Sequence, residues 1–167
     1  MKNLLEKLPG YNRKTLPLLI SAVVVIVFIW TQSVISISDS AWESGWITDH
    51  ILNPIFGLFG FSVSDMFTRK LAHFSEYAVL GLLISPLFNR KPTMCLYASL
   101  TVAFIDESIQ ILAKRGPSII DVWIDLSGAL VGFLIACAVY RSKRRKQRRL
   151  EAAETGNAGS DAEKGSD

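Results

Sequence analysis

The sequence predicts an all-α protein: a polytopic membrane helix bundle with four transmembrane helices and short interfacial helices between the first and the second. Half of the 167 residues are hydrophobic and the mean hydropathy is +0.31, which is too apolar for a typical soluble domain of this length. Charged residues are also strongly segregated, so that long stretches of the chain contain few or none. Both observations are typical of a small multi-pass membrane protein.

The first predicted span covers residues 16–37, within a stretch from Thr15 to Ser38 that carries no charge. At 1.5 Å per residue, a helix over this range is about 33 Å long and can cross the hydrocarbon core. A short basic segment, residues 1–14, precedes it. A signal peptide would have a shorter apolar stretch ending in small residues, so we expect an uncleaved span.

The segment that follows mixes acidic and aromatic side chains, a composition that favours the membrane interface. Within residues 39–68 we expect one or two short amphipathic helices, broken at Pro54, Gly57 and Gly60. Three further spans, separated by turns that contain proline, are predicted at residues 71–88, 93–113 and 119–140. The membrane domain therefore covers residues 15–140.

Residues 141–167 form a basic anchor followed by a polar tail. Seven of the nine residues from Arg141 to Arg149 are Lys or Arg. This block is explained most simply as an anchor that contacts anionic lipid of the bilayer, and we expect no nucleic-acid partner. The tail from Leu150 is rich in Ala, Gly, Ser, Asp and Glu, which predicts disorder.

The distribution of cations predicts the orientation. Four spans place both termini and the Arg90–Lys91 turn on one side of the membrane, and these segments carry most of the Lys and Arg. The positive-inside rule makes that side cytoplasmic. We therefore expect a multi-pass protein of the cytoplasmic (inner) membrane, with cytoplasmic N- and C-termini.

This topology brings polar side chains of three spans to one depth, near the outer surface. The predicted site consists of His73, Glu76, Asp106, Glu107, Gln110, Asp121 and Asp125, with Lys70, Tyr77 and Arg115 beside them. Steps of three and four residues place the members from each span on one helical face. Ionisable groups at membrane depth are costly, so they persist mainly where they have a function. The helical wheel allows either Asp106 or Glu107 to face the other spans.

Simpler explanations exist for individual members of this set. Asp121 alone could be solvated at the nearby turn, and His73 alone could be a satisfied interhelical hydrogen-bonding group. Gly128 and Gly132 form a GxxxG pattern that favours close helix packing rather than function. The convergence of five acids, a histidine and a glutamine at one depth favours a functional polar site over these explanations.

Three ordered motifs resemble those of the VanZ-like family of small membrane proteins: residues 69–81, 106–110 and 115–128. The resemblance covers about residues 16–140, and Gln32 and Ser33 resemble a weaker element of the family. It implies a bacterial membrane protein with four or five membrane helices and a role in the cell envelope. The namesake is associated with resistance to the lipoglycopeptide teicoplanin. The family's characteristic residues fall on the positions of the predicted site.

One functional hypothesis is an enzyme, a hydrolase or transferase that acts on a lipid-linked or cell-wall component at the outer leaflet. Five carboxylates in a partly desolvated site cannot all remain ionised unless a cation neutralises them. A divalent metal, Mn²⁺ or Zn²⁺, could bind His73 and Glu76 together with Glu107 or Asp106, and the carboxylate oxygens alone could suit Mg²⁺. Lys70 and Arg115 would then hold a phosphate or a sugar acid. Without a metal, one acid near His73 could act as a general base.

The alternative is a non-catalytic binding protein or a proton-coupled small transporter, in which the His/Asp/Glu chain relays protons. Four spans leave little room for a translocation path in a monomer, so this hypothesis requires a homo-oligomer. It also requires polar groups deeper in the membrane, where Ser85 and Cys137 are the only candidates. A purely structural role in partner binding comes third.

Overall fold

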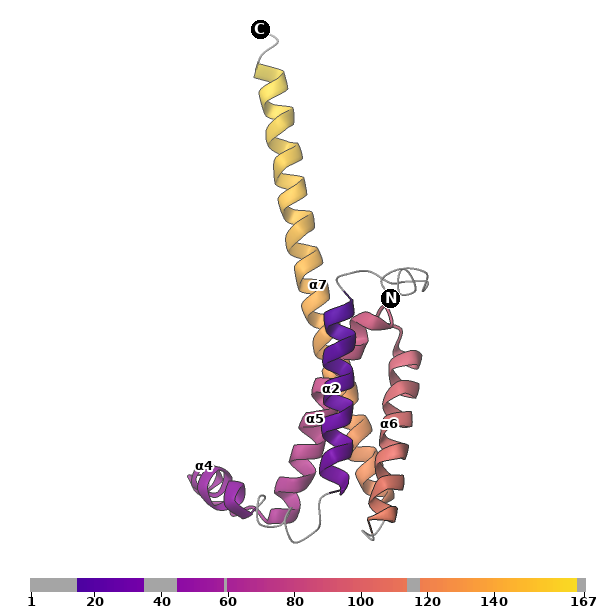
Figure 1. The fold of residues 1–167 in the computed structure, drawn as a ribbon. Coiled ribbons are helices and arrows are strands. Elements are labelled where there is room, and N and C mark those ends of the chain that lie inside the picture. Colours follow the sequence, from indigo (N-terminus) through magenta and orange to yellow (C-terminus); the bar gives the residue numbers. More distant parts are fainter. Residues whose placement is uncertain (1–14, 35–44, 59, 114–117, 165–167) are drawn as a thin grey trace.

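The computed structural model describes residues 15–34, 45–58, 60–113 and 118–164, with side chains as far as residue 152. The described residues form helices joined by turns and contain no strand (Figure 1). Residues 1–14, 35–44, 59, 114–117 and 165–167 lie outside the described part, and with them the predicted basic N-terminus, the last residues of the first predicted span, and Arg115.

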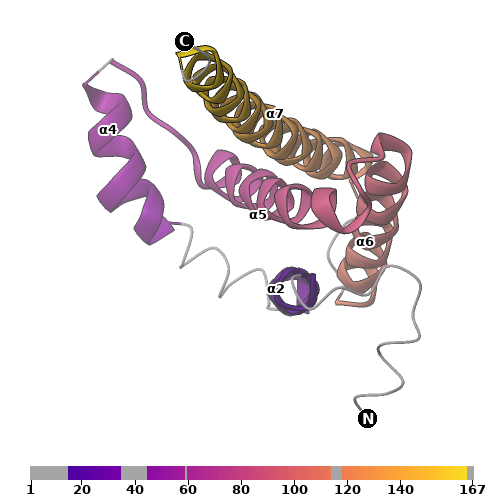
Figure 2. The same cartoon turned by 90° about the horizontal axis from the view of Figure 1, so that it is seen from above.

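Four helices form the bundle: α2 (Leu16–Val34), α5 (Asp65–Leu87), α6 (Pro92–Leu112) and α7 (Ile119–Lys164). Successive helices run in opposite directions, so α5 and α7 are parallel to each other (Figure 1). Helix α5 contacts all three of the others and lies between α2 and α7 (Figure 2). We call the end at which α2 and α6 end and α5 and α7 begin the acidic end, and the opposite end the basic end.

By length and composition, three of these helices can cross a membrane, and α5, expected as another span, is not among them. The three are Leu16–Val34, Pro92–Leu112 and residues Ile119–Ala152 of α7. Helix α5, predicted as the span at residues 71–88, begins earlier, at Asp65, and carries Lys70, His73 and Glu76 in its first half. These polar residues make it less apolar than the three candidate spans.

The bundle has an apolar exterior and a partly polar interior. Large hydrophobic side chains on the outside of the candidate spans are half exposed or more, for example Val24 on α2, Phe104 on α6 and Leu134 on α7. Meanwhile Ser33 and Asp106 are fully buried. A surface of this kind is suited to contact with lipid rather than with water.

The closest packing joins α5 to α7 through glycine. A Cβ atom on Gly128 would lie 2.2 Å from the Phe74 carbonyl oxygen, and one on Gly132 would lie 1.8 Å from that of Ala78. A Cβ on Gly81 of α5 would in turn lie 2.1 Å from the carbonyl oxygen of Ala129. No side chain fits at these distances, so the two backbones touch directly. The prediction that the GxxxG pattern permits close packing is confirmed.

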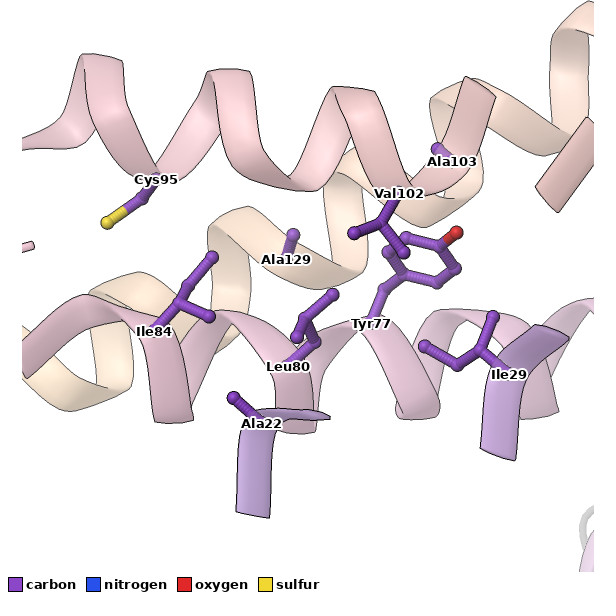
Figure 3. Packing of buried hydrophobic residues seen from close by; sticks show 9 residues of the cluster. All are labelled: Ala22, Ile29, Tyr77, Leu80, Ile84, Cys95, Val102, Ala103 and Ala129. Atoms are coloured by element: carbon purple, nitrogen blue, oxygen red, sulfur yellow. The ribbon is translucent and has the colours of Figure 1, made fainter. Parts of the chain in front are cut away.

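The core between the helices is small and lies mainly around α5. Tyr77 and Leu80 of α5 are almost completely buried and pack beside Ala22 and Ile29 of α2. Figure 3 shows the Tyr77 ring extending from α5 toward α6, where it lies beside Val102 and Ala103. The hydroxyl group of Tyr77 is thereby carried into the interior of the bundle.

The predicted interfacial segment contains one helical stretch from residue 45 to residue 57. It includes a π-helical turn, η1 (Thr48–Leu52), followed by α4 (Asn53–Gly57). The sequence predicted a helix break at Pro54, but the helix continues through this residue. Pro54 has no N–H to donate to residue 50, and the wider π turn, in which the Asn53 N–H donates to the Thr48 carbonyl, accommodates this loss. The helix ends at Gly57 and Gly60 has a positive φ of 77°, as a turn requires.

Hydrogen bonds connect this segment to the beginning of α5 and to the residues just before it. The hydroxyls of Thr48 and Thr68 are 2.6 Å apart, and Asn53 Oδ1 accepts a hydrogen bond of 2.8 Å from the Val63 N–H. Ser64 caps α5 by accepting from the Phe67 N–H at 3.3 Å. The η1–α4 helix therefore lies beside the acidic end, outside the bundle (Figure 1).

At the basic end, the Arg90 guanidinium lies 3.6 Å from the centroid of the Tyr140 ring, which joins the α5–α6 turn to α7. The predicted turn is formed, with Asn89 and Arg90 both at positive φ. Beyond Tyr140, α7 is helical to Lys164, a range that includes most of the tail for which the sequence predicts disorder. Arg, Lys, Gln, Glu and Ala are strong helix formers, and no proline follows to stop the helix.

Candidate functional site

The site at the acidic end begins with Asp106, which is fully buried on α6. One carboxylate oxygen accepts a hydrogen bond from the Ser33 hydroxyl of α2. The other accepts from Gln110 Nε2 at 3.1 Å, one turn further along α6. Two donors from two helices therefore hold this carboxylate in a fixed orientation.

Glu107, the next residue, is also buried but serves another part of the site. Its Oε2 accepts a hydrogen bond of 3.1 Å from the backbone N–H of Ser118, just before α7 begins. A carboxylate that accepts from an N–H at a helix N-terminus is favoured by the helix dipole. The helical wheel left open which of the two acids faces the other helices. The structure shows that both are buried, each with its own partners.

Helices α5 and α7 contribute two charge pairs. Lys70 Nζ lies 3.0 Å from Asp121 Oδ1, and both side chains are about one-third exposed, at 35% and 32%. Deeper in the bundle, His73 Nδ1 lies 3.9 Å from Asp125 Oδ1, and Asp125 is only 1% exposed. The pairs lie one turn apart on both helices because α5 and α7 are parallel and in close contact. The first is a solvated pair at the rim, whereas the second is interior.

His73, Asp106 and Asp125 come together at the centre of the site. One ligand atom from each of them lies within 4.8 Å of the other two. Helices α5, α6 and α7 each contribute one member of this group, which we call the central triad.

Two further polar atoms of α5 are buried in the bundle. Oε2 of Glu76 and the hydroxyl of Tyr77 have no hydrogen-bond partner among the residues that the structure describes. Tyr77 is completely buried. Buried polar atoms normally find a partner, so these two mark the part of the site where a ligand would be accommodated most readily.

The structure thus brings nine of the ten predicted site residues to the acidic end. They are Lys70, His73, Glu76, Tyr77, Asp106, Glu107, Gln110, Asp121 and Asp125; Arg115, the tenth, lies outside the described residues. The predicted metal ligands were His73 and Glu76 with Glu107 or Asp106, whereas the atoms that lie together belong to the central triad, which shares His73 and Asp106 with that prediction. Ser33 was not among the predicted site residues. Its signal in the sequence was the weaker family element at Gln32 and Ser33, near the C-terminal end of the first predicted span.

The fold and the site define the class of this protein. Three helices of membrane-spanning length with apolar exteriors, surrounding ionisable groups that avoid the lipid-facing surface, make it a helical membrane protein. The family model VanZ/LLP1 matches residues 18–140, which is most of the chain, and the protein belongs to this VanZ-like family. No curated protein and no solved structure matches the chain significantly.

Proposed function

We propose that this protein is a cell-envelope protein of the bacterial cytoplasmic membrane, and that its acidic end binds or acts on a lipid-linked or cell-wall component at the outer leaflet. The observation that supports this most strongly is the convergence of ionisable and hydroxyl side chains from all four bundle helices at one end. Asp106, Asp125 and Glu107 are buried there, although burial of a carboxylate is costly. Packing alone gives no reason to place them at that end.

An apolar groove at the same end supports a lipid-linked substrate. It lies between the outer halves of α2 and α6, has a volume of about 430 Å³, and is lined by Val27, Trp30, Thr31, Val34 and Ile109. Val34 directly follows the site residue Ser33, and Ile109 directly precedes the site residue Gln110. A molecule with an acyl or prenyl chain could place the chain in this groove and its polar head at the site. Lys70 is a cation at this site that could contact a phosphate or a sugar acid, and Arg115, the other predicted cation, lies outside the described residues.

In the proposed topology α5 is a fourth span, supported by its contacts with α2, α6 and α7. A reporter fused after Lys91 is then expected to be cytoplasmic, and one inserted between Lys114 and Arg115 external. Paired alkaline phosphatase and fluorescent-protein fusions measure this directly. If the Lys91 fusion is external and the Lys114 fusion is cytoplasmic, the proposed topology fails, because either the whole orientation is reversed or α5 does not cross the membrane.

The function itself is tested by His73→Ala and Glu107→Gln in cells that lack the native gene. Both variants are expected to abolish an envelope phenotype, such as a change in teicoplanin susceptibility, while membrane abundance stays near that of the wild type. His73→Ala removes a member of the central triad, and Glu107→Gln removes the charge of a buried carboxylate, while neither change touches the apolar core. Asp65→Asn, an exposed carboxylate at the beginning of α5, serves as the matched control and keeps the phenotype. Full activity of both site variants at matched abundance would contradict the shared site.

A proton-coupled transporter is the second candidate, and one observation favours it. Ser85 and Ser99 are almost completely buried in the half of the bundle toward the basic end, at 0% and 1% exposure. These hydroxyls are polar groups inside the bundle beyond the acidic end. They are not ionisable, however, whereas a proton relay normally uses Asp, Glu or His. The binding or enzymatic site at the outer leaflet therefore remains the proposal.

A further inference from the structure

We infer that the central triad, His73, Asp106 and Asp125, is a binding site for one divalent transition-metal ion. The three ligand atoms lie within 4.8 Å of one another. Around an ion with bonds of about 2.1 Å, neighbouring ligand atoms are separated by roughly 3–4 Å. Side-chain movements on the order of 1 Å would therefore bring all three into the coordination sphere of one ion.

The environment of Asp125 is the first independent support for an ion. This side chain is 1% exposed, and its Oδ1 accepts no hydrogen bond from the residues that the structure describes. His73 Nδ1 lies 3.9 Å from this oxygen, which is too long for a hydrogen bond. A buried carboxylate requires a compensating charge or several donors. A cation between Asp125, His73 and Asp106 would provide it.

The Asp106 carboxylate is oriented by hydrogen bonds from neighbouring side chains, as metal ligands in proteins usually are. Ser33 of α2 and Gln110 of α6 each donate to one of its two oxygens, and each oxygen keeps a further lone pair for coordination. Partners that orient a ligand without touching the metal raise affinity, because they fix the ligand before the ion arrives. This assigns Ser33 a positioning role.

The backbone around the triad is fixed by the glycine contact described above. Gly128 of α7 packs directly against the carbonyl oxygen of Phe74 on α5. Phe74 is adjacent to His73, and Gly128 is one helical turn from Asp125. The separation of these two ligands is therefore set by two backbones in contact, which gives the precision that a metal site needs.

The donor set indicates the kind of ion. One imidazole nitrogen with two carboxylate oxygens suits Zn²⁺ or Mn²⁺, whereas Ca²⁺ and Mg²⁺ favour oxygen ligands alone. For the role of the ion, the inference rests on the proposed function: a dication would offset the carboxylates and allow a phosphate or sugar acid to approach an otherwise acidic site. The existence of the site rests only on the geometry of the triad.

The experiment uses the full-length protein purified in detergent and stripped of metal with a chelator. Equilibrium dialysis against ZnCl₂ or MnCl₂, with elemental mass spectrometry, is expected to give about one ion per chain at saturation. Thermal unfolding should shift upward with ion concentration, because the ion binds the folded state. His73→Ala and Asp125→Asn are expected to weaken binding by more than about tenfold, and Ser33→Ala by about tenfold.

The chain contains matched controls on η1. His50→Ala removes the only other histidine in the sequence, and Asp49→Asn neutralises a neighbouring carboxylate; both side chains are exposed. Because neither change touches a proposed ligand, ion binding should stay within about twofold of the wild type. Equal loss in the controls and in the triad variants, or unchanged binding in both triad variants, would overturn the inference. If His73→Ala does not fold, His73→Gln and Ser33→Ala decide in its place.

The same variants separate this inference from the proposed function. If His73→Ala abolishes the envelope phenotype while ion binding is unchanged, the metal site is wrong and the proposed function stands. If ion binding is lost in the triad variants but the phenotype persists at matched abundance, the metal site is correct and the proposed function fails.

Discussion

Gly132→Leu is expected to destabilise the protein more than any other single substitution considered. Even the first atom of a side chain at this position would lie 1.8 Å from the Ala78 carbonyl oxygen and 2.9 Å from the Leu82 nitrogen. The obstruction is backbone, which cannot rotate away, so α5 and α7 must separate. We expect the free energy of unfolding to fall by about 3 kcal/mol or more, at the upper end for overpacking. Unfolding of the purified protein by titration with a denaturing detergent measures this change.

Gly57→Leu provides the matched control, because a Cβ atom on Gly57, at the end of α4, would have no atom within 4 Å. Its effect on stability should stay within about 0.5 kcal/mol, the usual range for surface substitutions. Gly128→Leu, which meets the Phe74 carbonyl, should resemble Gly132→Leu. A folded Gly132→Leu protein with normal stability would show that α5 and α7 are not in backbone contact.

The second large effect is expected for Asp106→Ala. This change removes the acceptor of the Ser33 hydroxyl and of Gln110 Nε2, both of which are buried. A buried donor without an acceptor costs about 1–3 kcal/mol. The variant should therefore lose about 2 kcal/mol or more of stability, lose the envelope phenotype, and accumulate in the membrane below the wild-type level. Immunoblotting of membranes alongside the phenotype checks all of these outcomes.

Asp106→Asn separates the two contributions of this residue. An asparagine keeps an oxygen that can accept from Ser33, and it fits the same space, but it carries no charge. Membrane abundance should therefore stay near that of the wild type while the phenotype is still lost. Retention of the phenotype in Asp106→Asn would mean that Asp106 serves the packing of the bundle and takes no direct part in the site.

Much of the helical architecture follows from the sequence because hydrophobic length and proline-containing turns act locally. Helices α2 and α6 begin within one residue of the predicted spans, and α7 begins at the predicted residue. Helix α5 was harder to place, because Lys70, His73 and Glu76 reduce its hydropathy while contacts with three neighbours stabilise it. The π turn before Pro54 and the continuation of α7 beyond Leu150 are not visible in hydropathy at all.

For the candidate site, the sequence predicted which helical face each residue occupies but not which residues contact one another. Residue spacing brought nine of its members to one end, but it could not distinguish the partners of Asp106 from those of Glu107. That distinction depends on where α2 and the beginning of α7 lie, since Ser33 meets the first acid and the Ser118 N–H meets the second. Contacts between residues this far apart in sequence are set by tertiary packing.

The glycine-mediated contact between α5 and α7 also bears on the way the protein is made. Of the two helices in this contact, α5 is synthesised before α7. The ionisable residues of α5 make it a poor candidate for stable insertion into hydrocarbon by itself. Helix α7, which holds it by direct backbone contact, leaves the ribosome only after α6 has been completed. During biogenesis, α5 is therefore expected to stay at the translocon or the membrane surface until α7 has been synthesised. A chain truncated after α6 should be recognised and degraded by membrane quality control.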